Sequence, residues 1–540
     1  MRIVASAVVK TGSTDRVMGA QGAQVRLDGG GMTAQPSLMV RIEDATLRPD
    51  LSRVIARLFL PGEELTSGHT RAEAVVERVL ALPESEVQEI VADLFEVFSS
   101  RHRRYQDILR AHAATLSYRV ENAALLTPER RLLLGATFTS EYAVEGAALC
   151  NPSAVPAPDQ SGLDPGQLRV AVSLRCIGEG HHSSIGFATA IIGPGAQWVF
   201  EPRTLPATTG PIEAGLWQRD RLMAVMQDHG TIDELGHRVL AALPTTFTGT
   251  ELGAVLADFE ADVRGRRTGP ATADLLRELA TSVYQVEFPD DVSLSQQVLM
   301  PATAQESNGM EDARFVRFHG EHSSGGQHSS AENDSADSTV EYRAVYTAYD
   351  GSHIAPRLLT SPDLKHFASH RLSGRAARDK GMALFPRLIG GRHFALCRSD
   401  GECNYVASSA DGLHWDTAIG IGAPQQIWQT IQVGNCGPPI ETADGWLVLT
   451  HGVGPMRVYR IGAMLLDLDE PARVIKVLKA PLLQGEPAER DGYVPNVVYS
   501  CGGLAHDRRL WLPYGIGDAR IGVAWADLDD VLAAMSPVPD

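Results

Sequence analysis

The chain has 540 residues, with 66 acidic against 48 basic side chains and a formal net charge of −18. This length exceeds one ordinary hydrophobic core and predicts two or three structural units. The acidic balance argues against a nucleic-acid or anionic-membrane partner, because such a partner requires a basic face. An anion bound by this protein must therefore meet a local positive site.

The six cysteines are scattered along the chain without a C-x-x-C pair. The sequence therefore predicts neither a zinc site nor a disulfide framework, and it indicates reduced thiols. We find no signal peptide and no run of about 18 apolar residues. We expect a cytoplasmic protein with no metal, no membrane and no nucleic acid as partner, and we leave a homo-oligomer open.

Residues 1–130 are predicted to form an accessory α/β region. Short β-like runs mix with Gly-rich turns up to about residue 60, and apolar residues then recur at helical spacing from about Thr70 to Leu116. Pro83 should separate two of these helices. Near Leu132 the period changes to alternation, and we interpret LLLGATFTSEYAV as strand. A β-domain should begin there.

Residues 131–205 are predicted to be the first unit of that β-domain, and residues 286–540 the remainder. Residues 206–285 interrupt it with several segments of helical periodicity that begin at Thr or Asp, which predicts a helical insertion. Residues 320–339 are so rich in Ser, Gly, Asp and His that they cannot bury a core, so we predict a disordered loop. The histidines in this loop are too loosely spaced to predict a metal site.

A repeat gives the β-domain its predicted architecture. Apolar strands with polar ends recur as QLRVAVSLRCIG, EYRAVYTAYDGS, RHFALCRSDGEC, GWLVLTHGVGPM and RLWLPYGIGDAR, and SPDLKHF is echoed by SADGLHW. The spacing suits propeller blades of four short strands, so we predict a mainly β fold with a five-bladed β-propeller. Equivalent strand ends should then converge on one axial pocket. These ends carry Arg175, Asp350, Arg398, His451 and Asp518.

The stretch GMEDARFVRF, Gly309 to Phe318, places two acids and an arginine immediately before an alternating strand. A rigid strand entrance can hold side chains with the accuracy that catalysis requires. The alternative interpretation is a salt-bridged turn, which is the commoner outcome for an isolated E-D-x-R group.

Three further stretches carry residues that a simple core does not need: DKGMALFP, WQTIQVGNCGPPIETADGWLVLTHGV and ERDGYVPNVVYSCG. Together with EDAR they resemble glycoside hydrolase family 130, whose members act on β-mannosides from a five-bladed propeller. The resemblance covers roughly 151–202 and 296–525. It implies cleavage with inversion, with inorganic phosphate as the nucleophile in the phosphorylases of the family and no other cofactor.

The resemblance also implies site residues. Asp312 matches the catalytic acid of the family, whose proton is thought to travel through a sugar hydroxyl. The phosphate-binding residues would be Arg314, Arg357, Lys380, His451 and Tyr459. The substrate-binding residues would be Asn151, Arg175, Glu311, Asp491, Tyr493 and Asp518. An anion nucleophile needs no general base, so one acid and a cationic cradle suffice for phosphorolysis.

Two alternatives to a phosphorylase remain open. Many phosphorylases of the family have His-Arg where this chain has Cys397-Arg398, so one cationic contact could be absent. An inverting β-mannosidase acting on β-1,2-linked mannosides would need a second carboxylate about 6.5 to 9.5 Å from the acid. Candidates for it are Glu441, Asp491 and Asp518. The other alternative is a non-catalytic carbohydrate-binding propeller.

Overall fold

The computed structural model describes residues 40–61, 70–120, 122–195, 197–230, 232–320 and 339–538. The predicted disordered loop, apart from its two end residues, lies outside this part of the chain. All of these described residues belong to one compact unit, Leu38–Asp540. None of the described helices is long and apolar enough to span a membrane.

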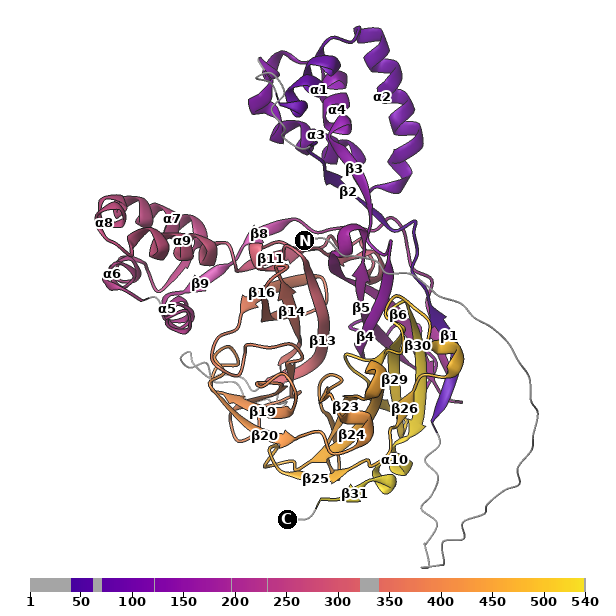
Figure 1. Cartoon of the computed structure of the whole chain (residues 1–540). Helices are drawn as coiled ribbons and strands as arrows, with labels where there is room; N and C mark the ends of the chain where they lie inside the picture. The colour runs from indigo at the N-terminus through magenta and orange to yellow at the C-terminus, as the bar shows by residue number, and fades with distance from the viewer. Residues whose placement is uncertain are drawn as a thin grey trace, which may run out of the picture. The chain divides into compact units, whose positions relative to one another are not determined.

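The N-terminal helices pack on a core of their own. They are α1 (Arg71–Leu80), α2 (Glu84–Phe98), α3 (Tyr105–Thr115) and α4 (Pro128–Thr137), beside the paired strands β2 (Val54–Leu58) and β3 (Thr139–Ala143) (Figure 1). Thr70 begins α1 with a capping box, in which its side chain accepts from the Glu73 amide. Helices α1 and α2 lie on either side of Pro83, as the sequence predicts.

The prediction of a strand from Leu132 onward is wrong for its first half, because residues 128–137 form the helix α4. The second half contains the strand β3. Thr127 accepts from the Arg130 amide and Pro128 occupies the first helical turn, which is a strong helix start. The three consecutive leucines Leu132, Leu133 and Leu134 all pack into the helical core. Burial on several sides hid the helical period that a half-exposed helix would show.

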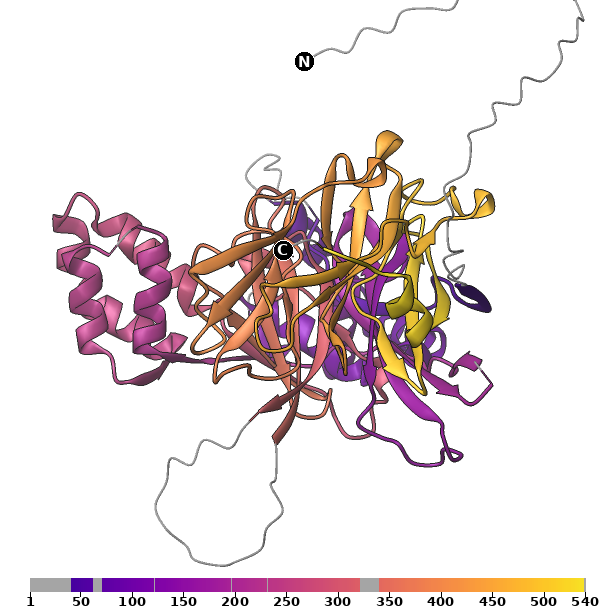
Figure 2. The same ribbon diagram turned by 90° about the horizontal axis from the view of Figure 1, so that it is seen from below.

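The predicted helical insertion contains α5 (Arg219–Asp228), α6 (Glu234–Ala242), α7 (Gly249–Asp258), α8 (Glu260–Gly265) and α9 (Gly269–Ala280). Figure 2 shows these helices grouped together, and they enclose their own core, in which Trp217 donates to the Leu279 carbonyl. Short strands flank the helices: β8 (Ile212–Ala214), β9 (Leu216–Gln218), β10 (Thr246–Thr248) and β11 (Tyr284–Glu287). Strand β11 pairs with β16 and thereby joins the insertion to the edge of a large sheet.

The remainder of the chain is mainly β, and its strands pair antiparallel except where β13 pairs in parallel with β6. The largest sheet runs in the order β4-β5-β6-β13-β14-β15-β16-β11-β8, with β7 and β12 on β6. Its strands not yet bounded are β4 (Ala148–Pro156), β5 (Leu168–Ile177), β6 (Ser183–Gly193), β7 (Gln197–Phe200), β12 (Val298–Leu299), β13 (Gly309–Gly320), β14 (Thr339–Tyr349), β15 (Ile354–Ser361) and β16 (His366–Arg371).

Three further sheets follow in sequence. The first is β17 (Ala383–Leu384), β18 (His393–Cys397), β19 (Asn404–Ser409) and β20 (Thr417–Gly422). The second contains β21 (Gln432–Asn435), β22 (Ile440–Thr442), β23 (Gly445–Val453), β24 (Tyr459–Leu466), β25 (Val474–Val477), β26 (Leu483–Gln484) and β31 (Ser536–Pro537). The third contains β27 (Val498–Tyr499), β28 (Leu504–His506), β29 (Arg509–Ile516) and β30 (Arg520–Asp527), followed by α10 (Leu528–Ala534). Strand β1 (Arg41–Leu47), from far earlier in the chain, pairs with β30.

Candidate active site

A cavity of about 680 Å³ gathers most of the predicted site residues from distant parts of the chain. The predicted residues that line it are Asn151, Arg175, Glu311, Asp312, Lys380, Arg398, His451, Tyr459, Tyr493 and Asp518. They come from β4, β5, β13, β23 and β24 and from loops after β16, β18, β26 and β29. Strand ends far apart in sequence therefore meet at one site.

Asp312 sits on a bulge near the start of β13. The register of the β13–β14 pair shifts between Glu311 and Arg314, and Asp312 has a φ of 55°. Asn151 has a φ of 51° at a similar register shift between Cys150 and Ser153 in β4. Bulges of this kind re-aim a side chain, and Asn and Asp tolerate the left-handed region better than most residues. The two bulged residues meet, because Asn151 Nδ2 donates to Asp312 Oδ1 at 2.5 Å.

Cations surround the Asp312 carboxylate. Arg175 NH1 lies 3.4 Å from Asp312 Oδ1, and Arg175 NH2 donates to Glu311 Oε1 at 2.6 Å. Burial opposes ionisation of Asp312, but Arg175, Arg314 and the Asn151 hydrogen bond outweigh it and lower the pKa of Asp312 below its usual value. Asp312 is therefore ionised at neutral pH when the cavity is empty.

Arg314 lies behind the cavity wall. Its guanidinium donates to Asn435 Oδ1 at 2.9 Å and to the Tyr499 hydroxyl at 2.7 Å, and the side chain is fully buried. Asn435 and Tyr499 themselves line the cavity. Arg314 therefore acts on the site through these two residues and through its charge.

Arg398 and Arg457 also line the cavity. Neither pairs with a carboxylate among the residues that the structure describes, and Arg398 Nε is buried without a hydrogen-bond partner. Lys380 differs, since its Nζ donates to Glu311 Oε2 at 2.6 Å. Arg398 and Arg457 are therefore cavity-lining cations without a carboxylate at ion-pair distance among the described residues, and Arg457 is exposed to solvent.

His451 is buried beside this positive charge. Burial, together with Arg398 and Arg314, lowers the pKa of His451 to about 3, so the imidazole is neutral at physiological pH. Its Nδ1 lies 3.1 Å from the Asn435 carbonyl oxygen, to which it donates. Nε2 is therefore an acceptor at the cavity, and Gln432 Nε2 lies 3.5 Å from it as a donor.

Asp518 follows β29 and has a φ of 48°. Burial raises the pKa of Asp518 to about 6, although Arg175 opposes this rise. Its Oδ1 is buried without a hydrogen-bond partner among the described residues, as is Oδ1 of Asn151. Both residues line the cavity, so its wall contains two acceptor oxygens without a partner among the described residues.

Arg357 does not reach the cavity, which corrects its predicted role in binding phosphate. It is fully buried, Nε lies 3.3 Å from Glu306 Oε1, and its guanidinium also bonds Tyr346 and Ser369. Arg357 lies within β15 (Ile354–Ser361), and the family resemblance alone implied its role in binding phosphate. Here the buried Glu306 compensates its charge.

Four other predicted positions do not line the cavity, namely Arg314, which lies behind its wall, and Asp350, Asp491 and Glu441. Asp350 was expected to line it with the other strand ends, but it faces a separate cavity and caps its own turn by accepting from the Ser352 and His353 amides. Asp491 is exposed and is not among the cavity residues. Of the three candidates for a second carboxylate only Asp518 lines the cavity, because Glu441 pairs with Arg387 at 2.7 Å outside it.

Sequence reasoning missed several cavity residues. Arg457, Gln432, Asn435, Tyr499 and His181 line the cavity but stand in no predicted set. His181 stacks on Tyr493 with ring centroids 5.5 Å apart. Asn435 and Tyr499 lie within stretches that carry the family resemblance, which was the available signal for them.

Comparisons with known proteins identify the family. The family model for glycoside hydrolase family 130, described as beta-1,4-mannooligosaccharide phosphorylase, matches residues 336–536. A 1,2-beta-oligomannan phosphorylase from Thermoanaerobacter sp. (strain X514) is 32% identical over 242 residues, covering 44% of this chain and 75% of that protein. The chain belongs to glycoside hydrolase family 130.

Other members of family 130 are also similar to this chain. A beta-1,2-mannobiose phosphorylase from the same Thermoanaerobacter strain is 32% identical over 238 residues, covering 43% of this chain and 72% of that protein. A solved beta-1,2-mannobiose phosphorylase from Listeria innocua aligns with a TM-score of 0.41 and 18% identity, covering 73% of this chain and 92% of that chain. This family-130 chain is an enzyme, as the EDAR stretch and the clustered cations predict.

Proposed function

We propose that this enzyme is an inverting β-mannoside phosphorylase that releases α-mannose 1-phosphate. The observation that carries the proposal is the pair Arg398 and Arg457, which line the cavity of Asp312 without a carboxylate partner among the described residues. Cations left uncompensated in an acidic protein favour an anionic ligand. Phosphate is such a ligand, and it is also a nucleophile that needs no general base.

Arg398 and Arg457 would hold phosphate together with Lys380, His451 and Tyr459. Charge-assisted bonds from the cations supply most of the affinity. The neutral His451 would accept a hydrogen bond at Nε2 from a protonated phosphate oxygen, because its Nδ1 proton is directed at the Asn435 carbonyl. The Tyr459 ring stacks near His451, with centroids 6.1 Å apart, and its hydroxyl can donate to the same anion.

The mannose ring would lie against Asn151, Asp518 and Arg175. The unpartnered oxygens of Asn151 and Asp518 provide acceptors for sugar hydroxyls, and an analogue without those hydroxyls would leave them unpaired. The stacked pair His181 and Tyr493 offers an aromatic surface at the same cavity. Asp312 would donate its proton toward the leaving oxygen through a sugar hydroxyl, as the family resemblance implies.

Phosphate binding would prepare the acid. Asp312 is ionised in the empty cavity because Arg175, Arg314 and Lys380 lower its pKa. A phosphate dianion beside these groups offsets their positive potential and raises the pKa of Asp312. The enzyme would thus acquire its proton donor only when the nucleophile is bound.

The first substrates to test are β-1,2-linked. Two relatives with 32% identity are a 1,2-beta-oligomannan phosphorylase and a beta-1,2-mannobiose phosphorylase. The test is incubation of the full chain with mannobioses of β-1,2, β-1,3 and β-1,4 linkage, with and without phosphate, while free mannose and mannose 1-phosphate are quantified. We expect phosphate-dependent α-mannose 1-phosphate from the β-1,2 disaccharide. Equal release of free mannose without phosphate would contradict the proposal.

An inverting β-mannosidase is the second candidate, and Asp518 favours it. This carboxylate lines the cavity of Asp312 and its pKa is raised to about 6, which suits a base that activates water. The same incubation separates the two functions, because hydrolysis yields free mannose whether or not phosphate is present. In a phosphorylase, Asp518 binds the sugar instead.

The sheets also support a proposed five-bladed propeller. The blades would be β4–β7, β13–β16, β17–β20, β21–β25 and β27–β30, with β1 adding an outer strand to the last one. In four of these groups one strand ends near a cavity residue: β5 near Arg175, β18 near Arg398, β23 near His451 and β29 near Asp518. Convergence of equivalent strand ends is the property that a propeller would supply. A crystal structure would test the blade count directly.

A further inference from the structure

The loop between β16 and β17, residues 372–382, carries Lys380 into the cavity but has little regular structure of its own. Its far end is held where Asn435 Nδ2 donates to the Gly381 carbonyl at 2.7 Å. Its near end is held by backbone bonds between Ser373 and the segment 413–415, including Ser373 N to Leu413 O at 3.0 Å. Lys380 thus lies in a loop that is held at both ends, at Gly381 and at Ser373.

The helical insertion grips that near end. Asp228, the last residue of α5, accepts a hydrogen bond from the Gly374 amide. Arg221 of the same helix donates to the carbonyls of Arg371 at 3.0 Å and Leu413 at 2.5 Å. One side chain therefore bonds both backbone segments that meet at the near end of the loop. His229 adds a contact, since its Nε2 lies 2.6 Å from Arg371 NH2.

Gly374 is the loop residue whose backbone packs directly against the backbone of Trp415. Its φ is 98°, and a Cβ atom there would lie 2.2 Å from the Trp415 carbonyl oxygen. Only glycine permits this approach, which presents the Gly374 amide to the insertion. The loop backbone is thus fixed between 413–415 on one side and α5 on the other.

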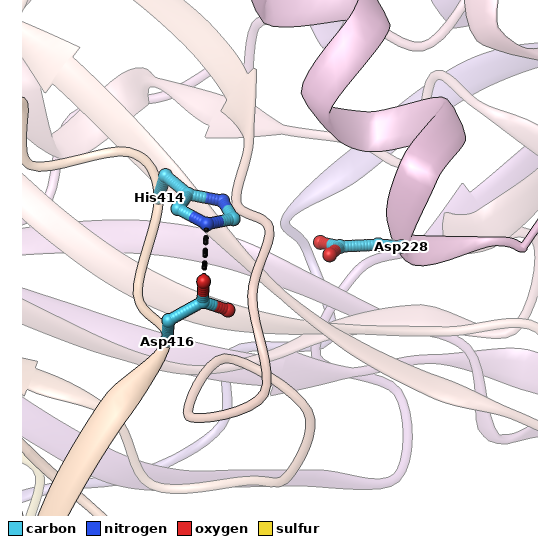
Figure 3. A group of neighbouring side chains, drawn as sticks. All are labelled: Asp228, His414 and Asp416. Atoms are coloured by element: carbon cyan, nitrogen blue, oxygen red, sulfur yellow. Dashed lines mark ion pairs between the residues drawn. The ribbon is translucent and has the colours of Figure 1, made fainter.

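The position of Asp228 is electrostatically unusual. A carboxylate at the C-terminal end of a helix faces the negative end of the helix dipole, which disfavours it. The hydrogen bond from Gly374 offsets that cost. Figure 3 shows the Asp228 carboxylate directed toward the pair His414 and Asp416, whose ring nitrogen and carboxylate are 2.9 Å apart. These three residues have ligand atoms within 4.8 Å of one another, but the Gly374 amide and Ser373 Oγ already engage Asp228 and His414, so we assign them no metal.

We propose that Asp228 and Arg221 of the helical insertion are positioning residues that set the place of Lys380 in the active site. The proposal rests on the proposed function for its kinetic consequence. The helical insertion would then contribute to the active site, because loss of the hydrogen bonds from Asp228 and Arg221 would displace Lys380, which pairs with Glu311. Neither Asp228 nor Arg221 touches the cavity itself.

The test compares Asp228→Ala, Asp228→Asn and Asp220→Ala in the full chain. Asparagine keeps an oxygen that accepts from the Gly374 amide, so Asp228→Asn should behave like the wild type. Asp220 lies on the same helix with a side chain that is 92% exposed, which makes Asp220→Ala the matched control. Arg221→Ala is a second disruptive variant if Asp228→Ala does not fold.

Two readouts are measured. The first is the rate at which an amine-reactive reagent labels Lys380, followed by mass spectrometry with Lys365 as the internal reference. The second is the pair of Michaelis constants, for phosphate and for the mannoside. Loss of one such anchor should raise Lys380 labelling and the constant for phosphate by about fivefold or more, with the mannoside constant changed less.

Unchanged Lys380 labelling in Asp228→Ala and Arg221→Ala would overturn the proposal. So would faster labelling with unchanged constants for both substrates, because the loop would then move without affecting the site. Equal effects in Asp228→Asn and Asp228→Ala would overturn the role of the Gly374 hydrogen bond. If the wild type proves independent of phosphate, the proposed function fails, while the labelling result and the mannoside constant still decide whether α5 positions Lys380.

Discussion

Lys380 Nζ donates to Glu311 Oε2 at 2.6 Å and thereby links the loop after β16 to the strand that carries Asp312. Glu311 is nearly fully buried, and its other oxygen accepts from Arg175. One buried carboxylate thus holds two cations whose charges both act on the proposed acid. Changes to any of these groups should alter binding and proton transfer together.

Replacement of Asp312 by asparagine should remove most turnover. The amide keeps the shape of the carboxylate but has no acidic proton, and loss of general-acid assistance typically costs about 10² to 10⁴ in rate. The measurement is kcat on an unactivated mannoside, with circular dichroism to show that the fold is kept. Retention of more than half of the activity would mean that another group supplies the proton.

Replacement of Arg398 by alanine should weaken phosphate binding. A charge-assisted hydrogen bond is worth about 1.5 to 3 kcal/mol, so the Michaelis constant for phosphate should rise roughly tenfold to a hundredfold. Lys380→Ala should act in the same direction, and the two effects should not simply add because both residues would touch one ligand. Arg392→Ala, an exposed position of the same sheet, is the control. A rise confined to the mannoside constant would place the phosphate elsewhere.

Arg357→Ala should lower stability and leave phosphate binding unchanged. Removal of one partner of a buried ion pair typically costs about 3 to 5 kcal/mol, because Glu306 would remain charged and buried. The exposed pair Lys365–Asp290 gives the control Lys365→Ala, for which the expected cost is about 0 to 1 kcal/mol. Thermal unfolding and the phosphate constant are measured together. If Arg357→Ala were as stable as the wild type but had a higher Michaelis constant for phosphate, Arg357 would be a phosphate-binding residue after all.

The pH dependence of turnover should change with phosphate concentration. Phosphate is expected to raise the depressed pKa of Asp312, so more of the acid is protonated at a given pH. The alkaline limb of the rate profile should therefore move to higher pH as phosphate approaches saturation. Profiles at low and saturating phosphate that superimpose would show that the anion and the acid are not linked.

The carboxyl group of Asp518 should make stability fall as pH rises from about 4 to about 6. Its pKa is raised from 3.8 to about 6 in the folded chain, so the folded state binds more protons than the unfolded state in this window. Asp518→Asn should remove a penalty of up to about 3 kcal/mol at pH 7 and change little at pH 3.5. Denaturant unfolding at both pH values measures the difference. A variant no more stable than the wild type at pH 7 would contradict the raised pKa.

The sequence reveals the site better than it reveals the N-terminal half. Asp312 and Lys380 are found through the motifs that carry the family resemblance, and His451 also through the repeat of polar residues at strand ends. The role of Arg357 is predicted wrongly. Its charge is compensated by Glu306, and the sequence does not show that these two residues are buried beside each other. The α4 helix is missed because its leucines are buried on several sides and lose their period.

Asn151, Asp312 and Asp518 share left-handed backbone angles, with φ of 51°, 55° and 48°. Substitution there by a β-branched residue carries a conformational penalty of about 1 to 3 kcal/mol before any chemistry is considered, whereas glycine carries none. The set of amino acids compatible with folding at these positions is therefore small. Directed evolution of a new specificity should advance fastest from residues with ordinary backbone angles, such as His451 or Tyr493, and saturation libraries at the three left-handed positions should yield mostly Gly, Asn and Asp among the folded members.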